Sequence, residues 1–193
     1  MKRPLLIAAL LYAALAASAN PLPAQELTAE HRAELAELRE GDMRKLIVHE
    51  TPVPAPDTPF TDREGHETTL AASNGRVRLV NFWATWCAPC RREMPALDAL
   101  QRDLGGPDFE VLLIATGRNS PEAIDDFAAD VGITTLTTFL DPRSRLAAAM
   151  NVPGLPVTVL LNREGQEIAR LLGDADWNGE SARAIVAALI AAK

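Results

Sequence analysis

Hydrophobic positions in the second half of the chain alternate between unbroken runs and runs with helical spacing. Val77–Trp83 and residues 109–115 are nearly continuous apolar stretches, which is typical of strands buried on both faces. Between them, residues 87–104 place apolar side chains every three or four positions, as one face of a helix does. The pattern therefore predicts a strand, a helix and a second strand in immediate succession.

The remaining elements continue this alternation to the end of the chain. They are a helix over Pro121–Val131, a short helix at 143–150, strands at Val157–Leu161 and 167–172 joined by a turn at 163–165, and a closing helix at 181–192. Strands that alternate with helices, followed by a hairpin and a helix, predict an α/β fold. We expect a layered sandwich around a mixed central sheet flanked by helices.

The region upstream of this domain has a different pattern. Residues 27–48 have apolar side chains at helical spacing, and Thr28 is placed to cap an amphipathic helix that packs on the domain or acts as a spacer. Residues 50–59 contain four prolines, which predicts an extended linker rather than a strand of the central sheet. Residues 60–70 resemble a hairpin that turns at 63–65. We therefore divide the chain into 1–19, a linker and helix at 20–50, and the α/β domain at 51–193.

The first 19 residues have the pattern of an export signal. Lys2 and Arg3 precede an uncharged apolar stretch, which ends at the small residues Ala17-Ser18-Ala19. The stretch is short for a membrane span, which needs about 20 residues, so either cleavage or retention as an anchor is consistent with it. Both alternatives predict a domain outside the cytoplasm, most simply in a periplasm, either soluble or attached to the inner membrane.

Charge and cysteine content reduce the number of possible functions. The formal net charge of −7 makes the chain a poor partner for nucleic acid. Its two cysteines, Cys87 and Cys90, would close a loop too small to stabilise the fold appreciably. The three histidines are scattered upstream of the pair, so we expect no metal site. No glycine-rich phosphate loop is present, and we predict no cofactor.

The position of the cysteine pair indicates redox chemistry. Both cysteines fall in the first turn of a helix that follows directly on a buried strand, and two tryptophans precede them. A helix N-terminus offers free N–H groups and a partial positive charge, which stabilise a thiolate. We therefore predict that Cys87 is the nucleophile and that Cys90, one turn further on and more buried, resolves the mixed disulfide.

The segment 80–95, VNFWATWCAPCRREMP, resembles the active-site segment of thioredoxin-fold proteins, and more narrowly the exported TlpA-like (TlpA/ResA) thiol:disulfide interchange proteins. This resemblance implies a thioredoxin-like fold, a periplasmic location and a reducing role. The partners it implies are proteins with oxidised cysteine pairs, namely a copper chaperone, an oxidase subunit or apocytochrome c. A membrane thiol transporter would be the electron donor.

The resemblance also assigns roles to further residues. Pro156 falls where the family has a cis-proline facing the cysteines, so that the backbone of Leu155 would pair with a substrate peptide. Glu93 lies where relatives have a glutamate that tunes cysteine protonation, and it would accept the proton of Cys90; the alternative is a solvated helix glutamate. Asn81 replaces a buried aspartate of cytoplasmic thioredoxins. We expect Trp86 to contact substrate, whereas Trp83 and Trp177 belong to the core.

Two other functions remain open from the sequence. The same fold also serves disulfide oxidases and isomerases, although strong oxidants often have a histidine between the cysteines, where this chain has Ala88-Pro89. A copper(I) carrier would use the two cysteines as soft ligands, and Met94 is the nearby candidate for a third. The reduction of partner disulfides is the preferred hypothesis.

Overall fold

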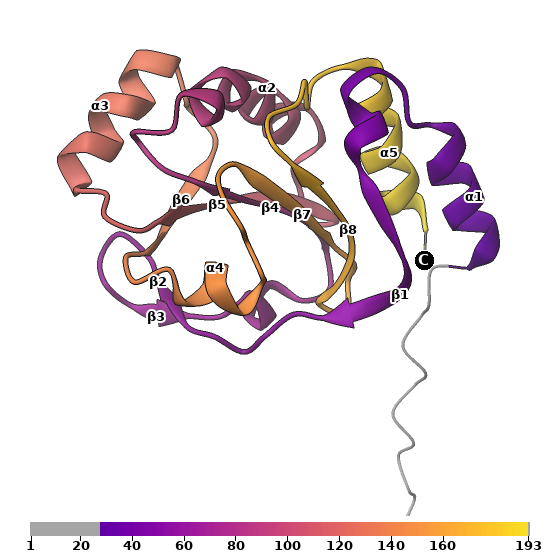
Figure 1. The fold of residues 1–193 in the computed structure, drawn as a ribbon, viewed down its shortest axis with the longest axis horizontal. Helices are drawn as coiled ribbons and strands as arrows, with labels where there is room; N and C mark the ends of the chain where they lie inside the picture. Colours follow the sequence, from indigo (N-terminus) through magenta and orange to yellow (C-terminus); the bar gives the residue numbers. More distant parts are fainter. Residues whose placement is uncertain (1–27, 193) are drawn as a thin grey trace, which may run out of the picture.

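An eight-stranded mixed sheet forms the middle layer of the structure, a computed structural model that describes residues 28–192 (Figure 1). The strand order is β1-β8-β7-β4-β5-β6-β2-β3. The strands are β1 Ile47–Pro54, β2 Phe60–Thr61, β3 Glu67–Thr68, β4 Val77–Trp83, β5 Phe109–Thr116, β6 Thr137–Asp141, β7 Val157–Leu161 and β8 Gln166–Leu172. The pairs β4–β5 and β5–β6 are parallel, whereas β4–β7, β7–β8 and β1–β8 are antiparallel. The predicted mixed sheet is thus confirmed.

Helices cover both faces of this sheet. They are α1 Ala29–Glu37, α2 Ala88–Leu104, α3 Pro121–Val131, α4 Arg145–Ala149 and α5 Glu180–Ala191, with 3-10 turns η1 Gly41–Lys45 and η2 Leu70–Ser73. Side chains of α2, α3 and α5 form one core cluster against the sheet, and α4 and η2 contribute to a second cluster on the opposite face. Figure 1 shows α2 and α3 together on one side and α4 on the other. This is the predicted thioredoxin-like sandwich.

The N-terminal region differs from the sequence prediction. Instead of one helix over 27–48, α1 ends at Glu37, the 3-10 turn η1 follows, and β1 begins at Ile47. Gly41 has a φ of 50°, in the left-handed region that interrupts a right-handed helix. Thr28 does cap α1, since its hydroxyl accepts the N–H of His31 at 3.2 Å. The extension packs on the domain, because the buried Leu35 belongs to the same core cluster as α5 residues.

The predicted linker is in part an edge strand. β1 runs to Pro54 and pairs with β8 at the edge of the sheet, so the first half of 50–59 is not a free linker. Pairing shifts register between Val48 and Val53, around Pro52. A proline costs no ladder hydrogen bond at an edge or a bulge, which explains how a proline-rich segment joins the sheet. The hairpin expected at 60–70 is present as β2 and β3.

The proposed export signal at 1–19 lies outside the described residues. Within residues 28–192, no helix combines the length and the apolar character that crossing a membrane requires.

β6, which the sequence analysis missed, contains two threonines and is only partly buried, so its apolar pattern is weak.

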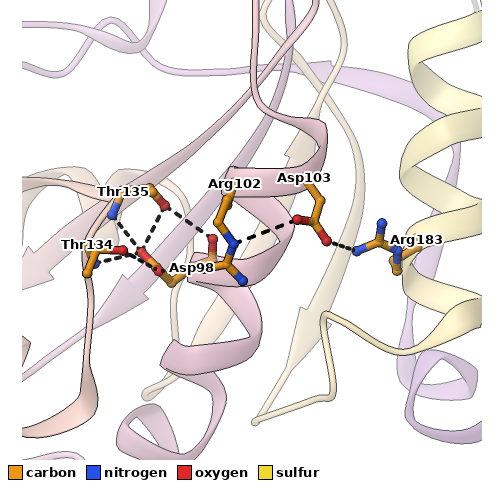
Figure 2. A network of polar contacts seen from close by, with 6 residues as sticks. All are labelled: Asp98, Arg102, Asp103, Thr134, Thr135 and Arg183. Atoms are coloured by element: carbon orange, nitrogen blue, oxygen red, sulfur yellow. Dashed lines mark hydrogen bonds and ion pairs between the residues drawn. The ribbon is translucent and has the colours of Figure 1, made fainter.

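A buried carboxylate fastens α2 to the segment between α3 and β6. The side chain of Asp98 accepts the backbone N–H groups of Thr134 at 3.0 Å and Thr135 at 2.8 Å, and also both threonine hydroxyls. Figure 2 shows this cluster, with Arg102 on its solvent side at 3.4 Å from Asp98. Burial would raise the pKa of Asp98, but the hydrogen bonds from Thr135 and Thr134 together outweigh it, so that the pKa lies below its usual value.

The same network continues to α5 through partly exposed groups. Asp103 lies 3.8 Å from Arg102 and 2.7 Å from Arg183, which is a residue of α5 (Figure 2). Ion pairs of this exposure contribute little to stability, at most about 1 kcal/mol. Asp98 is therefore the member of the network that ties α2 to the segment between α3 and β6.

We expect Asp98→Ala to lower the free energy of unfolding at pH 7 by about 2–4 kcal/mol, because four donors lose their acceptor. Urea unfolding of the oxidised protein measures this loss. Asp103→Ala is the matched control and should cost less than about 1 kcal/mol. Since the pKa of Asp98 is lowered, its contribution is present above the usual aspartate pKa of about 4 and disappears as the pH falls below it. Equal losses for the two variants would contradict the assignment.

Candidate active site

The cysteine pair lies where β4 passes into α2. Every residue of β4 is buried, because the strand pairs with β5 on one side and β7 on the other. The chain then turns, with the N–H of Cys87 bonded to the carbonyl of Ala84 at 3.1 Å. Cys87 is the N-cap of α2, and its Sγ accepts the N–H of Cys90 at 3.3 Å. The sulfur of Cys87 thus replaces the usual hydroxyl or carboxylate cap.

Cys87 and Cys90 form a disulfide, and the two sulfurs are not equally accessible. Cys87 is 5% exposed, whereas Cys90 is completely buried. An incoming thiolate therefore reaches the Cys87 sulfur first. In the reduced form the N–H groups at the start of α2 favour a thiolate on the capping residue, Cys87. The geometry agrees with an attacking Cys87 and a resolving Cys90.

An asparagine that the sequence analysis missed fixes the loop before the cysteines. The side-chain oxygen of Asn119 accepts the N–H of Thr85 at 2.9 Å and its hydroxyl at 3.1 Å. Its amide group donates to the carbonyls of Thr116 and Gly117 at the end of β5. Because the carboxyl ends of parallel strands lie at one edge of a sheet, a polar residue just after β5 was the signal that could have identified Asn119.

The peptide bond between Leu155 and Pro156 is cis. Val157, the next residue, lies opposite Phe82 in the antiparallel pair of β7 and β4, so Pro156 is beside the end of β4 where the chain turns toward Cys87. The carbonyl of Pro156 accepts the N–H of Gly173 at 2.9 Å. The site thus has the cis conformation that the resemblance implied, while the binding role of Leu155 and Pro156 remains a prediction.

The three tryptophans divide as expected from the sequence. Trp86 is 69% exposed and directly precedes Cys87, so its indole is available to a partner. Trp83 is buried and contacts Phe127 of α3, with ring centroids 4.6 Å apart. Trp177 is also fully buried.

Glu93 is a buried carboxylate rather than a solvated helix residue. It is 2% exposed and lies one turn after Cys90 on α2. Oε1 accepts the amide of Asn81 at 2.8 Å, and that amide also donates to the hydroxyl of Thr158 at 3.0 Å. Oε2 accepts the N–H of Ala175 and the indole N–H of Trp177, both at 3.3 Å. Donors from β4 and from the segment after β8 thus converge on this one carboxylate of the cysteine helix.

Burial raises the pKa of Glu93 to about 7. The hydrogen bonds from Asn81, Ala175 and Trp177 favour the ionised form but are outweighed, and the negative charge of Asp174 raises the pKa further. A carboxyl group that titrates near neutral pH can accept a proton and release it again under ordinary conditions. Asn81 itself cannot ionise, and acts here as a donor to Glu93.

The copper alternative would use the cysteine pair with Met94 as a third ligand. Met94 is fully buried in the core cluster that also contains Cys87 and Cys90. Within residues 28–192, the one group of three potential ligands is Asp62, Glu64 and His66, on the exposed turn between β2 and β3. That group includes neither cysteine.

Comparison with known proteins agrees with this site. The Redoxin family model matches residues 50–189. The chain is 35% identical over 112 residues to the thiol-disulfide oxidoreductase ResA of Geobacillus kaustophilus, and 31% identical over 117 residues to the thiol:disulfide interchange protein HelX of Rhodobacter capsulatus. These matches cover 58% and 61% of this chain, and 63% and 60% of the two relatives, which is less than two thirds of either.

Solved structures show the same fold. A thiol:disulfide interchange protein DsbE from Chlorobium tepidum superposes with a TM-score of 0.62 at 27% identity, covering 72% of this chain and 96% of that one. A secreted thiol-disulfide isomerase from Corynebacterium glutamicum gives a TM-score of 0.63 at 23% identity, over 79% and 93% of the two chains. The latter likeness concerns the fold alone.

The raised pKa of Glu93 predicts a specific dependence of stability on pH. The folded protein keeps this proton up to about pH 7, whereas the unfolded chain loses it near 4.5, the ordinary pKa of a glutamate. Stability of the oxidised protein should therefore fall as the pH rises from 4.5 to 7, by about 3 kcal/mol for this group, and then level off.

Urea unfolding of wild type and Glu93→Gln across this pH range measures the effect. The variant, which cannot ionise at position 93, should gain stability relative to wild type as the pH rises. A constant difference between the two proteins would contradict the raised pKa.

Proposed function

Because the chain belongs to the Redoxin family, we propose that it is a thiol:disulfide oxidoreductase that reduces disulfides in partner proteins. The observation that carries the proposal is the Cys87–Cys90 disulfide at the first turn of α2, with the accessible sulfur on the capping residue. The names of its relatives, a thiol-disulfide oxidoreductase and a thiol:disulfide interchange protein, support the same reaction.

The reaction follows from the different environments of the two sulfurs. The thiolate of Cys87 attacks a partner disulfide, forms a mixed disulfide and releases one partner thiolate. Cys90 then loses its proton and attacks the Sγ of Cys87, which restores the Cys87–Cys90 bond and releases the second partner sulfur as a thiolate. Glu93, one turn along α2, is the base that takes the proton of Cys90. A thiol donor must then reduce the pair again.

The partner peptide binds along the exposed surface next to Cys87. Leu155 offers its backbone to an extended peptide just before the cis-Pro156, in the manner of an added strand. The exposed indole of Trp86 supplies apolar contact from the other side of the cysteine. These three residues are the proposed substrate-binding set.

The setting we propose is the periplasm, with the domain released after cleavage or held at the inner membrane by the segment 1–19. The partners are proteins with oxidised cysteine pairs in the assembly of cytochrome c or of the copper site of cytochrome oxidase: apocytochrome c, a copper chaperone or an oxidase subunit. A membrane thiol transporter supplies the electrons. The segment resembling TlpA-like proteins supports this choice.

The reduction potential decides between reductant and oxidant. We expect equilibration with glutathione, followed by tryptophan fluorescence, to give a midpoint of about −250 mV or lower. Trp83 and Trp86 directly precede the pair and report its state. A midpoint near about −120 mV would identify a disulfide oxidase instead. Tight stoichiometric copper(I) binding by the reduced protein without any disulfide exchange would favour the copper carrier.

Trp86→Ala tests the binding surface. Loss of an exposed aromatic contact should raise KM for a protein disulfide about ten-fold, equivalent to about 1.4 kcal/mol, with little change in reactivity toward a small disulfide. Steady-state kinetics with a peptide carrying an oxidised Cys-X-X-Cys-His pair provide the measurement. Ile47→Ala is the matched control, since Ile47 is an exposed apolar residue on the edge strand β1. An equal effect of both variants would exclude a specific role for Trp86.

A further inference from the structure

A cleft reaches Glu93 from the surface of the protein. It has a volume of about 220 Å³, enough for several water molecules at about 30 Å³ each. Its lining comes from α2, from the segment after β8 and from η1, and consists of Asp42, Arg92, Glu93, Ala96, Asp174, Ala175 and Asp176. Glu93, which is 2% exposed, is more deeply buried than Ala175, another buried residue of this lining.

Cys90 has no comparable access to solvent. Its side chain is completely buried, so the proton that it loses on attacking Cys87 must pass to another group before it reaches water. Glu93 is the buried carboxyl one turn further along the same helix. Its Oε2 is held by Ala175 and Trp177, which lie on the segment that forms the opposite wall of the cleft.

An ion pair joins the two walls. Arg92, next to Glu93 on α2, contacts the carboxylate of Asp174 through Nε at 3.0 Å and Nη2 at 2.9 Å. Lys45 of η1 donates to the Asp174 carbonyl at 2.7 Å. The other wall groups, Asp42 and Asp176, are joined by the bond from the Asp176 N–H to Asp42 at 3.2 Å. A buried carboxyl therefore opens onto a polar cleft that is crossed by one cation–anion pair.

We propose that this cleft is the route by which Glu93 exchanges its proton with solvent, and that Arg92 and Asp174 are positioning residues that control the exchange. The inference rests on the proposed role of Glu93 as the base for Cys90. In each turnover the carboxylate of Glu93 takes the proton from the Cys90 thiol. The Cys90 thiolate then bonds to the Sγ of Cys87, the bond from Cys87 to the partner breaks, and the neutral Glu93 releases the proton to water in the cleft.

The charged groups near Glu93 lie on the side of the cleft. On that side lie Asp42, Asp174, Asp176 and Arg92, with Lys45 of η1 at 3.3 Å from Asp42. The negative charge of Asp174 raises the pKa of Glu93. From β4 the carboxyl accepts a hydrogen bond from the neutral amide of Asn81, which also donates to the hydroxyl of Thr158 on β7. A change of charge on the cleft wall should therefore act on Glu93 directly.

Paired charge variants test this control. Asp174→Asn should move the titration midpoint of Glu93 to lower pH, and Arg92→Gln, which leaves Asp174 unneutralised, should move it to higher pH. The matched controls are Asp130→Asn and Arg91→Gln, since that ion pair joins α2 to α3, with 3.5 Å between the groups, and does not line the cleft. Carbon-13 NMR of glutamate-labelled oxidised protein measures the midpoint, with Glu93→Gln identifying the resonance.

A third variant tests the route without changing any charge. Ala96→Leu fills the cleft from α2 and should slow the resolution of a preformed mixed disulfide several-fold. Ala148→Leu, an exposed alanine of α4, is its control. Stopped-flow tryptophan fluorescence measures resolution, and the melting temperature confirms folding. A wild-type resolution rate in Ala96→Leu would overturn the route.

The outcomes distinguish the role of Glu93 as the base from the control of its proton exchange by Arg92 and Asp174. If Glu93→Gln leaves the rate and pH profile of resolution unchanged, the proposed base is wrong. If Glu93→Gln changes that profile but Asp174→Asn and Arg92→Gln behave like Asp130→Asn and Arg91→Gln, Glu93 remains the base and the control by the Arg92–Asp174 pair is wrong.

Discussion

The hydrogen bond from the Cys90 N–H to the sulfur of Cys87 is the contact on which the rest of the site depends. It makes a cysteine the cap of α2, so the helix N-terminus stabilises a negative charge on Cys87, the proposed nucleophile. The position of that cap is fixed by β4, which is paired on both sides and buried along its whole length. The core therefore holds the redox centre in place, because the strand and helix that carry it belong to the core.

The same core also sets the pKa of Glu93. A carboxylate buried this deeply would be costly without donors, and Asn81, Ala175 and Trp177 provide them. Neutral donors alone do not offset the loss of hydration, and Asp174 adds a repulsive charge, so the proton is held up to about pH 7. Asparagine at position 81 is important in this respect. It supplies a hydrogen bond without a second negative charge, so that one buried carboxyl group titrates without a buried carboxylate as neighbour.

Whether a feature of the fold or the site could be predicted from the sequence depended on how far apart in the chain its interacting residues lie. The buried strands β4 and β7, the helix α2 and the redox pair have signatures within a few consecutive residues, and these predictions were confirmed. β1 was missed because its prolines are acceptable only at an edge, and edge position is a property of the whole sheet. Asn119 and the donors to Glu93 from Ala175 and Trp177 were missed for the same reason: these hydrogen bonds join segments far apart in the chain, and their convergence depends on strand order.

Two buried carboxylates on α2 illustrate why burial alone does not identify function. Asp98 accepts two backbone N–H groups and two hydroxyls, and its pKa is lowered, so it remains ionised and holds the layers together. Glu93 has fewer backbone donors and a neighbouring negative charge, and its pKa is raised. Only a group near its titration point can exchange a proton at each turnover, whereas a strongly ionised group serves as a fixed acceptor. The direction of the pKa change, together with access to the cleft, therefore supports a structural role for Asp98 and the proposed role of Glu93 as a base.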